Sequence, residues 1–147
     1  MAVRKEITDQ FVSAMFNLVK AIKDESELCC KICGGVNEKE LMIIVFVGQM
    51  TSATMSGIAE NIEAPLSTLT SIVDKLVAGK YLSRYNSEED RRVVRVELAE
   101  KGQEAYGNFL KQKAITAKKV LSRFTEEERT ALVRQLDKLA AAINSLR

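Results

Sequence analysis

The fold is decided by the stretch from Met55 to Gly102, MSGIAENIEAPLSTLTSIVDKLVAGKYLSRYNSEEDRRVVRVELAEKG. Its first half predicts two short helices. Thr54 is a plausible cap for a helix to about Asn61, and Pro65 suits the first position of the next helix, where a missing N–H does no harm. That second helix carries an apolar stripe of helical period, formed by Leu69, Ile72, Val73 and Leu76. Gly79 suits its C-terminal cap, so the pattern predicts helix, turn and helix.

The period of the sequence changes after this second helix. Residues 81–85 and 94–98 carry β-branched or aromatic side chains, and the second segment alternates, so both predict strands. The charged loop from Asn86 to Arg91 joins them, and the tip of such a hairpin must stand in solvent. Two short helices followed by a hairpin predict a winged helix-turn-helix, with its helix-turn-helix over residues 54–79 and its wing over residues 81–98.

The segment before this stretch predicts two further helices. Residues 4–30 have apolar side chains at steps of three and four, which places them on one face of a long helix. Gly34–Gly35 ends that helix. Asn37, followed three residues later by Glu40, has the form of a capping box and begins a second, largely buried helix.

The segment after the wing predicts two long helices over residues 100–146. The first ends near Arg123, and the second begins after Thr125, whose hydroxyl and the three glutamates that follow make a strong capping signal. The fold class is therefore mainly α with a small β-hairpin, a winged helix-turn-helix with long N- and C-terminal dimerisation helices. No linker is visible, so we expect one domain over residues 1–147.

Composition excludes several classes of function. The 147 residues hold 22 Lys and Arg against 20 Asp and Glu, so binding to an acidic partner must come from local placement of charge. The absence of histidine removes the commonest general base and the usual Ser-His and Cys-His nucleophile pairs. No apolar run is long enough to span a bilayer and no secretory leader opens the chain, so we expect a cytoplasmic protein without membrane contact.

The outward face of the second short helix is rich in small hydroxyls. Once its apolar stripe faces inward, four side chains remain exposed near its N-terminus, Ser67, Thr68, Thr70 and Ser71. Small hydroxyls can approach base edges and phosphates closely, so this helix is a candidate reader of the DNA major groove. The alternative is that these hydroxyls only cap or solvate the helix.

The loop of the hairpin adds a second DNA-binding signal. Asp90 stands beside Arg91 and Arg92, and an arginine inserted into a narrow minor groove gains from the concentrated negative potential there. The carboxylate two residues before Arg92 can hold its side chain in one orientation. The cations expected to bind phosphate are Lys75, Lys80, Arg84 and Arg91. The alternative is a solvated turn with incidental charges.

These segments together resemble the multiple antibiotic resistance regulator (MarR) family, most strongly from Met55 to Gly102. The resemblance implies a bacterial or archaeal dimeric transcription regulator on a pseudo-palindromic duplex, usually a repressor released by a ligand or an oxidant. It also implies that Asp90 and Arg92 are the paired wing residues, and that residues 67–71 hold the contacts of the recognition helix. The sequence departs from the family pattern at Ala99, where Thr is usual and would cap the next helix, and at Pro65, where a polar residue is usual.

The two ends of the chain carry apolar stripes of near-heptad spacing, which exceed what the core of one winged domain needs. Their members are Ile7, Phe11, Leu18, Leu132, Leu136, Leu139, Ile143 and Leu146. Pairing with the same helices of a second copy would make a two-fold interface, so we expect a homodimer. The alternative is that these helices pack only on each other within one chain.

Three cysteines, Cys29, Cys30 and Cys33, end the first helix. An odd number so close together does not indicate a disulfide framework. They are small buried apolar residues, or a redox sensor in which the neighbouring Lys31 lowers a thiol pKa, or part of a metal site. Zinc normally takes four ligands, and no histidine can supply the fourth, so we predict no metal site.

The sequence thus predicts a sequence-specific DNA-binding regulator, and a small-molecule effector or oxidation is expected to modulate its affinity. We expect no enzymatic activity and no cofactor. One alternative is a winged module that binds proteins through its hydroxyl face. A second is a cysteine-dependent enzyme, which the lack of histidine and of a glycine-rich phosphate loop argues against.

Overall fold

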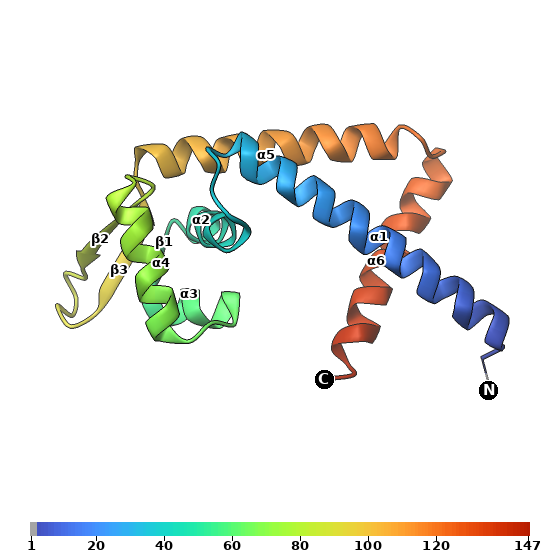
Figure 1. The fold of residues 1–147 in the computed structure, drawn as a ribbon, viewed down its shortest axis with the longest axis horizontal. Coiled ribbons are helices and arrows are strands. Elements are labelled where there is room, and N and C mark those ends of the chain that lie inside the picture. Colours follow the sequence, from blue (N-terminus) through green and yellow to red (C-terminus); the bar gives the residue numbers. More distant parts are fainter. Residues whose placement is uncertain (1–2) are drawn as a thin grey trace. The chain divides into compact units, whose positions relative to one another are not determined.

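The computed structural model describes residues 3–147, and its order of elements matches the expected fold class (Figure 1). The elements are α1 (Lys5–Ile32), α2 (Glu38–Met50), β1 (Ser52–Thr54), α3 (Met55–Ile62), α4 (Leu66–Ala78), β2 (Leu82–Asn86), β3 (Val94–Leu98), α5 (Glu100–Leu121) and α6 (Glu126–Asn144). The chain forms two compact units, one ending at Phe109 and the other running from Leu110 to Arg147, so the boundary falls within α5. The expected single domain over residues 1–147 stays a prediction.

The turn between α1 and α2 follows the local signals of the sequence. Gly34 and Gly35 have φ angles of 98° and 76°, a left-handed conformation that glycine adopts without steric cost. The predicted capping box is present: Asn37 Oδ1 accepts from the Glu40 N–H at 2.9 Å, and Glu40 Oε2 accepts from the Asn37 N–H at 2.9 Å. The N-terminus of α2 is therefore fixed by reciprocal hydrogen bonds.

The sheet has three strands in the order β1–β3–β2, all antiparallel. The hairpin of β2 and β3 was predicted, with β2 displaced by one residue toward the C-terminus. The strand β1 was not predicted, because the sequence of this segment indicates only a polar connection between two helices. It pairs Ser52 with Glu97 and Thr54 with Arg95, so a segment distant in the sequence supplies its hydrogen-bonding partners.

The core of the first unit lies where α2, α3 and α4 meet the sheet. Its fully buried side chains include Ile43, Ile44, Val47, Ile58, Leu69, Val73, Leu82 and Val96. In α4 the predicted stripe faces this core, with Leu69, Val73 and Leu76 buried and Ile72 half-buried. Because this stripe is buried, the opposite face of α4 is directed to solvent.

One of the two cap predictions for α4 needs correction, and the other is confirmed. Pro65 is the N-cap residue, with ψ of 144°, and the helix begins at Leu66. Gly79 is the C-cap residue, as expected, but with φ of −78°, and the left-handed residue that follows is Lys80, with φ of 63°. The bend that opens the wing is therefore made by a lysine, which adopts this region less readily than glycine does.

The start of α5 is capped by backbone groups rather than by a side chain. The N–H of Ala99 donates to the Tyr81 carbonyl at 3.0 Å, and the N–H of Lys101 donates to the Lys80 carbonyl at 3.3 Å. The Lys101 bond satisfies a donor that the usual threonine could otherwise cap, and the two bonds tie the start of α5 to the residues just before β2. The departure at Ala99 is therefore compensated locally.

The second unit contains the C-terminal part of α5 and all of α6. The predicted capping box at Thr125 is present, because Thr125 Oγ1 accepts from the Glu128 N–H and the Glu128 carboxylate accepts from the Thr125 N–H. Arg129 Nε donates to the Leu121 carbonyl at 2.8 Å across the turn between the two helices. No residue of α6 is buried.

Candidate nucleic-acid interface

The outward face of α4 presents the predicted hydroxyls. Ser67, Thr68, Thr70 and Ser71 are all exposed. Thr70 Oγ1 donates to the Leu66 carbonyl at 2.8 Å, a back-bond that fixes its rotamer and leaves the oxygen able to accept. The helix therefore offers short, polar side chains on a rigid element supported by the core.

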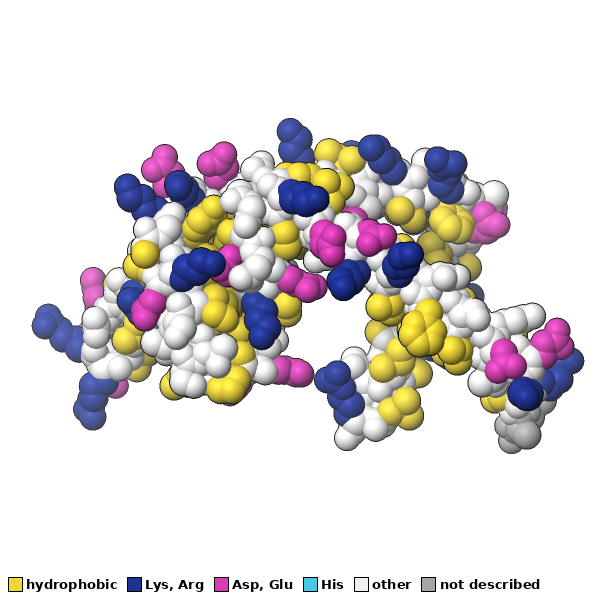
Figure 2. Space-filling view, viewed as in Figure 1, with side chains coloured by type: hydrophobic (Ala, Val, Ile, Leu, Met, Phe, Trp, Pro, Cys, Tyr) yellow, Lys and Arg dark blue, Asp and Glu magenta, His cyan; other side chains and the backbone are white. Residues whose placement is uncertain are grey.

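The tip of the wing is ordered by hydrogen bonds within the loop. Asp90 Oδ1 accepts from the backbone N–H of Arg92 at 3.0 Å and lies 3.6 Å from Arg92 Nε, so the predicted pair is brought together. The side chain of Arg92 is 95% exposed. Asn86 Nδ2 donates to the Arg91 carbonyl at 2.6 Å and steadies the other side of the loop. Figure 2 shows Lys and Arg side chains at the end of the wing.

Two of the four cations predicted to bind phosphate are engaged within the first unit. Lys75 Nζ lies 2.6 Å from Glu40 Oε1, and Arg84 Nη1 donates to Asp74 Oδ1. Lys80 and Arg91 are exposed. Sequence reasoning identified Glu40 as a helix cap but missed its ion pair, for which nothing in the local pattern gives a signal.

The electrostatics of Glu40 follow from its burial and its partners. Only 4% of Glu40 is exposed, and this desolvation alone would raise the pKa of its carboxyl group. The hydrogen bonds from Lys75 and Asn37, with the charge of Lys75, act in the other direction and leave the pKa of Glu40 below its ordinary value. The group is therefore a carboxylate at neutral pH.

Arg95 is an arginine of the sheet that sequence reasoning did not single out. Its Nη2 donates to Ser52 Oγ at 2.8 Å and its Nε donates to the same oxygen at 3.1 Å. This side chain joins β3 to β1 and so supports the wing from within the sheet. The alternation of β3 predicted a strand but gave no indication of this partner.

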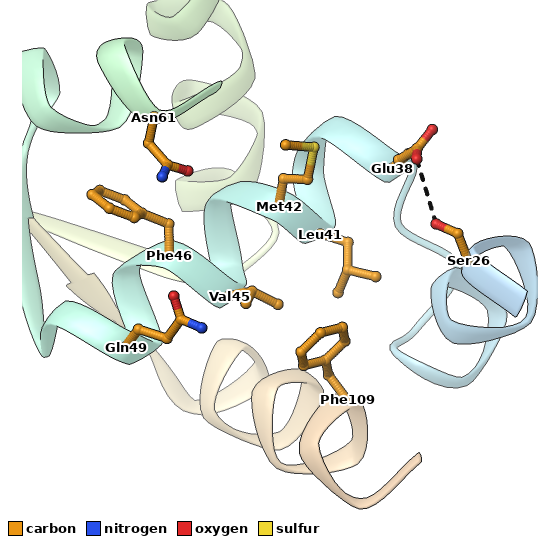
Figure 3. A pocket seen from close by; sticks show the side chains of 9 residues that line it. All are labelled: Ser26, Glu38, Leu41, Met42, Val45, Phe46, Gln49, Asn61 and Phe109. Carbon is orange, nitrogen blue, oxygen red and sulfur yellow. Dashed lines mark hydrogen bonds between the residues drawn. The ribbon is translucent and has the colours of Figure 1, made fainter. Parts of the chain in front are cut away.

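A mostly apolar cavity of about 220 Å³ lies in the first unit beside α2 (Figure 3). Its lining residues are Ser26, Glu38, Leu41, Met42, Val45, Phe46, Gln49, Asn61 and Phe109. Figure 3 shows Leu41 and Val45 of α2 facing Phe109 of α5, with Gln49 and Asn61 contributing amide groups. This composition fits a small, largely apolar molecule held by a few polar groups.

The three cysteines are free thiols. Cys29 and Cys33 are buried; Cys33 Sγ donates to the Ala105 carbonyl at 3.3 Å, and Cys29 Sγ donates to Glu25 Oε1 at 3.3 Å. Cys30 is half-buried, and burial together with the charges of Glu38 and Glu27 raises its pKa. The pKa of Cys33 is also raised, by burial and by the neighbouring Cys30.

For Cys30 and Cys33 the expectation that Lys31 lowers a thiol pKa is not met, because burial and neighbouring charges raise the pKa of each. Within residues 3–147 no group of His, Cys, Asp and Glu side chains is arranged to hold a metal ion.

The predicted dimerisation stripes are largely exposed in the single chain. On α1, Ile7, Phe11 and Leu18 are 51%, 50% and 41% exposed, and Cys29 is the only buried residue of that helix. On α6, Leu136 and Ile143 are exposed, whereas Leu132 and Leu139 are half-buried; Leu146, just after the helix, is also exposed. Large apolar side chains in such contiguous stripes mark surfaces that another molecule covers.

None of the helices within residues 3–147 combines the length and the apolar character that a transmembrane span requires.

Comparison with known proteins shows what this geometry is similar to. The model of the MarR family matches residues 36–94, which run from just before α2 through α4 and β2 to the first residue of β3. The chain is 29% identical over 108 residues to the HTH-type transcriptional repressor MdtR of Bacillus subtilis, covering 74% of this chain and 70% of MdtR.

Solved structures agree on the fold over nearly the whole chain. YusO from Bacillus subtilis matches with a TM-score of 0.74 and 27% identity, covering 96% of this chain and 99% of YusO. FabT from Streptococcus pneumoniae, solved in complex with DNA, matches with a TM-score of 0.78 and 23% identity, covering 98% and 100%. In its helix-turn-helix, its wing and its flanking helices the chain is thus similar to these solved structures, and its residues 36–94 match the model of the MarR family.

Proposed function

We propose that this protein is a homodimeric, sequence-specific regulator of transcription, a repressor that binds pseudo-palindromic double-stranded DNA. The observation that carries the proposal is the pairing, in one rigid unit, of a hydroxyl-bearing helix with an arginine held by a carboxylate at the wing tip. Two family relationships support it: FabT was solved in complex with DNA, and MdtR is named a transcriptional repressor.

In this proposal the two elements read different grooves. Residues 67–71 of α4 enter the major groove, where short hydroxyls reach base edges and phosphates. Arg92 enters the adjacent minor groove with its orientation restricted by Asp90. Lys80, Arg84 and Arg91 contact phosphate and set the position of the protein on the duplex.

The exposed apolar stripes of α1 and α6 support a dimer with a second copy of this chain. A two-fold interface presents two copies of α4 to half-sites about 34 Å apart, one turn of the duplex. Two linked sites bind more tightly than one without added charge, which suits a chain of net charge +2.

The apolar cavity beside α2 supports regulation by a small ligand. The raised pKa values of Cys30 and Cys33 favour a ligand over oxidation as the signal, because thiolates are the reactive species. The role requires no catalytic step and no cofactor, and it is exerted in the cytoplasm.

Selection from a randomised duplex pool tests DNA binding. The parent protein should enrich a pseudo-palindromic sequence, and its affinity should fall steeply from low to physiological salt as counterions are released from DNA. If no sequence is enriched and the affinity for duplex at low salt is negligible, the DNA-binding proposal is wrong. Salt-insensitive capture of a protein partner would instead favour a protein-binding module.

Sedimentation equilibrium tests the dimer with a matched pair of variants. Phe11→Glu introduces a carboxylate into the exposed stripe of α1 and should shift the protein toward monomer. Gln10→Glu adds the same charge at the neighbouring position of the helix and should leave the dimer intact. A monomeric parent protein would contradict the proposal, as would equal behaviour of the two variants.

A further inference from the structure

Two consecutive residues of α4 tie this helix to different parts of the first unit. Lys75 Nζ reaches Glu40 Oε1 at the N-terminus of α2, at 2.6 Å. Asp74 Oδ1 accepts a hydrogen bond from Arg84 on β2. The helix that carries the exposed hydroxyls is therefore held by charged contacts on both sides.

The contact with Glu40 is the less exposed of the two. Among the described residues, Glu40 is the only charged one that is buried, with 4% of its surface exposed. Its second carboxylate oxygen accepts from the Asn37 N–H at 2.9 Å, so both oxygens have partners. In the pair of Arg84 and Asp74, the side chains are 36% and 53% exposed, and water screens their attraction.

Because Glu40 is buried, its ion pair with Lys75 limits which other groups Lys75 can bind. The side chain of Lys75 is 71% exposed, but its ammonium group is the cation that the structure pairs with the buried carboxylate. A lysine that turned to a DNA phosphate would leave a buried charge unpaired, and that loss exceeds what one solvent-exposed phosphate contact returns.

We propose that Lys75 is a positioning residue, which through its ion pair with Glu40 fixes α4 against the N-terminus of α2, and that it does not contact DNA phosphate. This inference rests on the proposed DNA-binding function and differs from the expectation from sequence, which placed Lys75 among the phosphate contacts. It makes Glu40 a determinant of specificity although its carboxylate is buried within the protein.

Two isosteric variants and their double test this assignment. Glu40→Gln removes the charge but keeps a side chain that can complete the capping box, and Lys75→Met keeps the length of the stem. Binding is measured over a salt series to a duplex selected by the parent protein from a randomised pool, and to a shuffled duplex of the same composition. Arg91→Met, which removes an exposed wing cation, is the matched control. Circular dichroism and urea unfolding verify that each variant folds.

Each single variant should bind the selected duplex roughly fivefold more weakly, the lower range of coupling between an internal contact and a binding site. The double variant should match the singles, because both remove one interaction. Affinity for the shuffled duplex and the slope of log affinity against log salt should stay at parent values, whereas Arg91→Met should reduce the slope by about one.

The opposite assignment predicts different changes in the salt slope and in the affinity. If Lys75 contacts phosphate, Lys75→Met reduces the salt slope, and Glu40→Gln frees the lysine and strengthens binding to both duplexes. Either result, or parent-like binding of both single variants, overturns the inference. If Glu40→Gln does not fold, the salt slope and affinity of Lys75→Met decide alone. A parent protein that selects no duplex overturns the proposed function, and this inference falls with it.

Discussion

Gly102 lies in the first turn of α5, against the backbone that opens the wing. A Cβ at this position would lie 2.0 Å from the carbonyl oxygen of Tyr81 and 3.0 Å from its carbonyl carbon. The same oxygen accepts the N–H of Ala99 at 3.0 Å. The obstacle is backbone rather than the flexible end of a side chain, so Gly102→Ala must displace the start of the wing or the start of α5.

The magnitude follows from three opposing contributions. Overpacking of this kind costs about 1–3 kcal/mol, and weakening the bond to Ala99 costs about 1 kcal/mol more. The higher helix propensity of alanine returns up to about 1 kcal/mol. We therefore expect Gly102→Ala to lower the free energy of unfolding by about 2 kcal/mol.

Gly107 on the same helix provides the matched control. A Cβ there meets nothing within 4 Å, so only the propensity gain remains and Gly107→Ala should stabilise by about 0.5–1 kcal/mol. Urea unfolding of both variants and the parent at one protein concentration measures the difference. The reasoning is refuted if Gly102→Ala is as stable as the parent, or if the two variants differ by less than about 1 kcal/mol.

Further experimental outcomes are expected for the wing, for α4, for the buried carboxylate and for the half-buried thiol. Arg92→Ala should weaken duplex binding at low salt by about 1–3 kcal/mol without changing unfolding, since its side chain is 95% exposed; parent-like fluorescence anisotropy would contradict this. Thr70→Ala should relax base preference, by about 1–3 kcal/mol for each lost base contact, more than it lowers non-specific affinity, as measured by competition with base-substituted duplexes. The pKa of Glu40 is lowered on folding, so its stabilisation is present above its unfolded pKa of about 4.3 and is lost as pH falls through the folded pKa. Urea unfolding of Glu40→Gln from pH 7 to about pH 3 should lack this contribution. The raised pKa of Cys30 should make its alkylation by iodoacetamide at about pH 8 slower than that of free cysteine, and an equal rate would contradict the assigned burial.

Local signals in the sequence were sufficient for most of the fold. The capping boxes at Asn37 and Thr125 are encoded within four residues each, and the bounds of β3 follow from its own alternation. The strand β1 depends on pairing between Ser52 and Glu97, and three polar and small residues have no periodicity that indicates a strand. Sequence analysis therefore did not predict the pairing between segments that lie far apart in the chain.

For the candidate interface too, the sequence predicted local features but not contacts between distant residues. The exposure of the α4 hydroxyls follows from the apolar stripe on the other face of the same helix, so sequence alone predicted it. The direction of Lys75 depends on Glu40, which is 35 residues away in the sequence. From the sequence alone, a lysine on the outward half of such a helix is expected to contact phosphate. The ion pair with the buried carboxylate is seen only in the structure.

This placement of charge bears on how the protein recognises DNA. With a net charge of +2, and with Lys75 engaged by a buried carboxylate, the attraction of a duplex from a distance is weak. Under the proposed function, discrimination between sequences then rests on the fixed position of the α4 hydroxyls and of Arg92. Groups held in place before binding lose less conformational entropy on contact than mobile surface cations do. Disorder introduced into α4 should therefore reduce specificity more than the loss of any single exposed lysine.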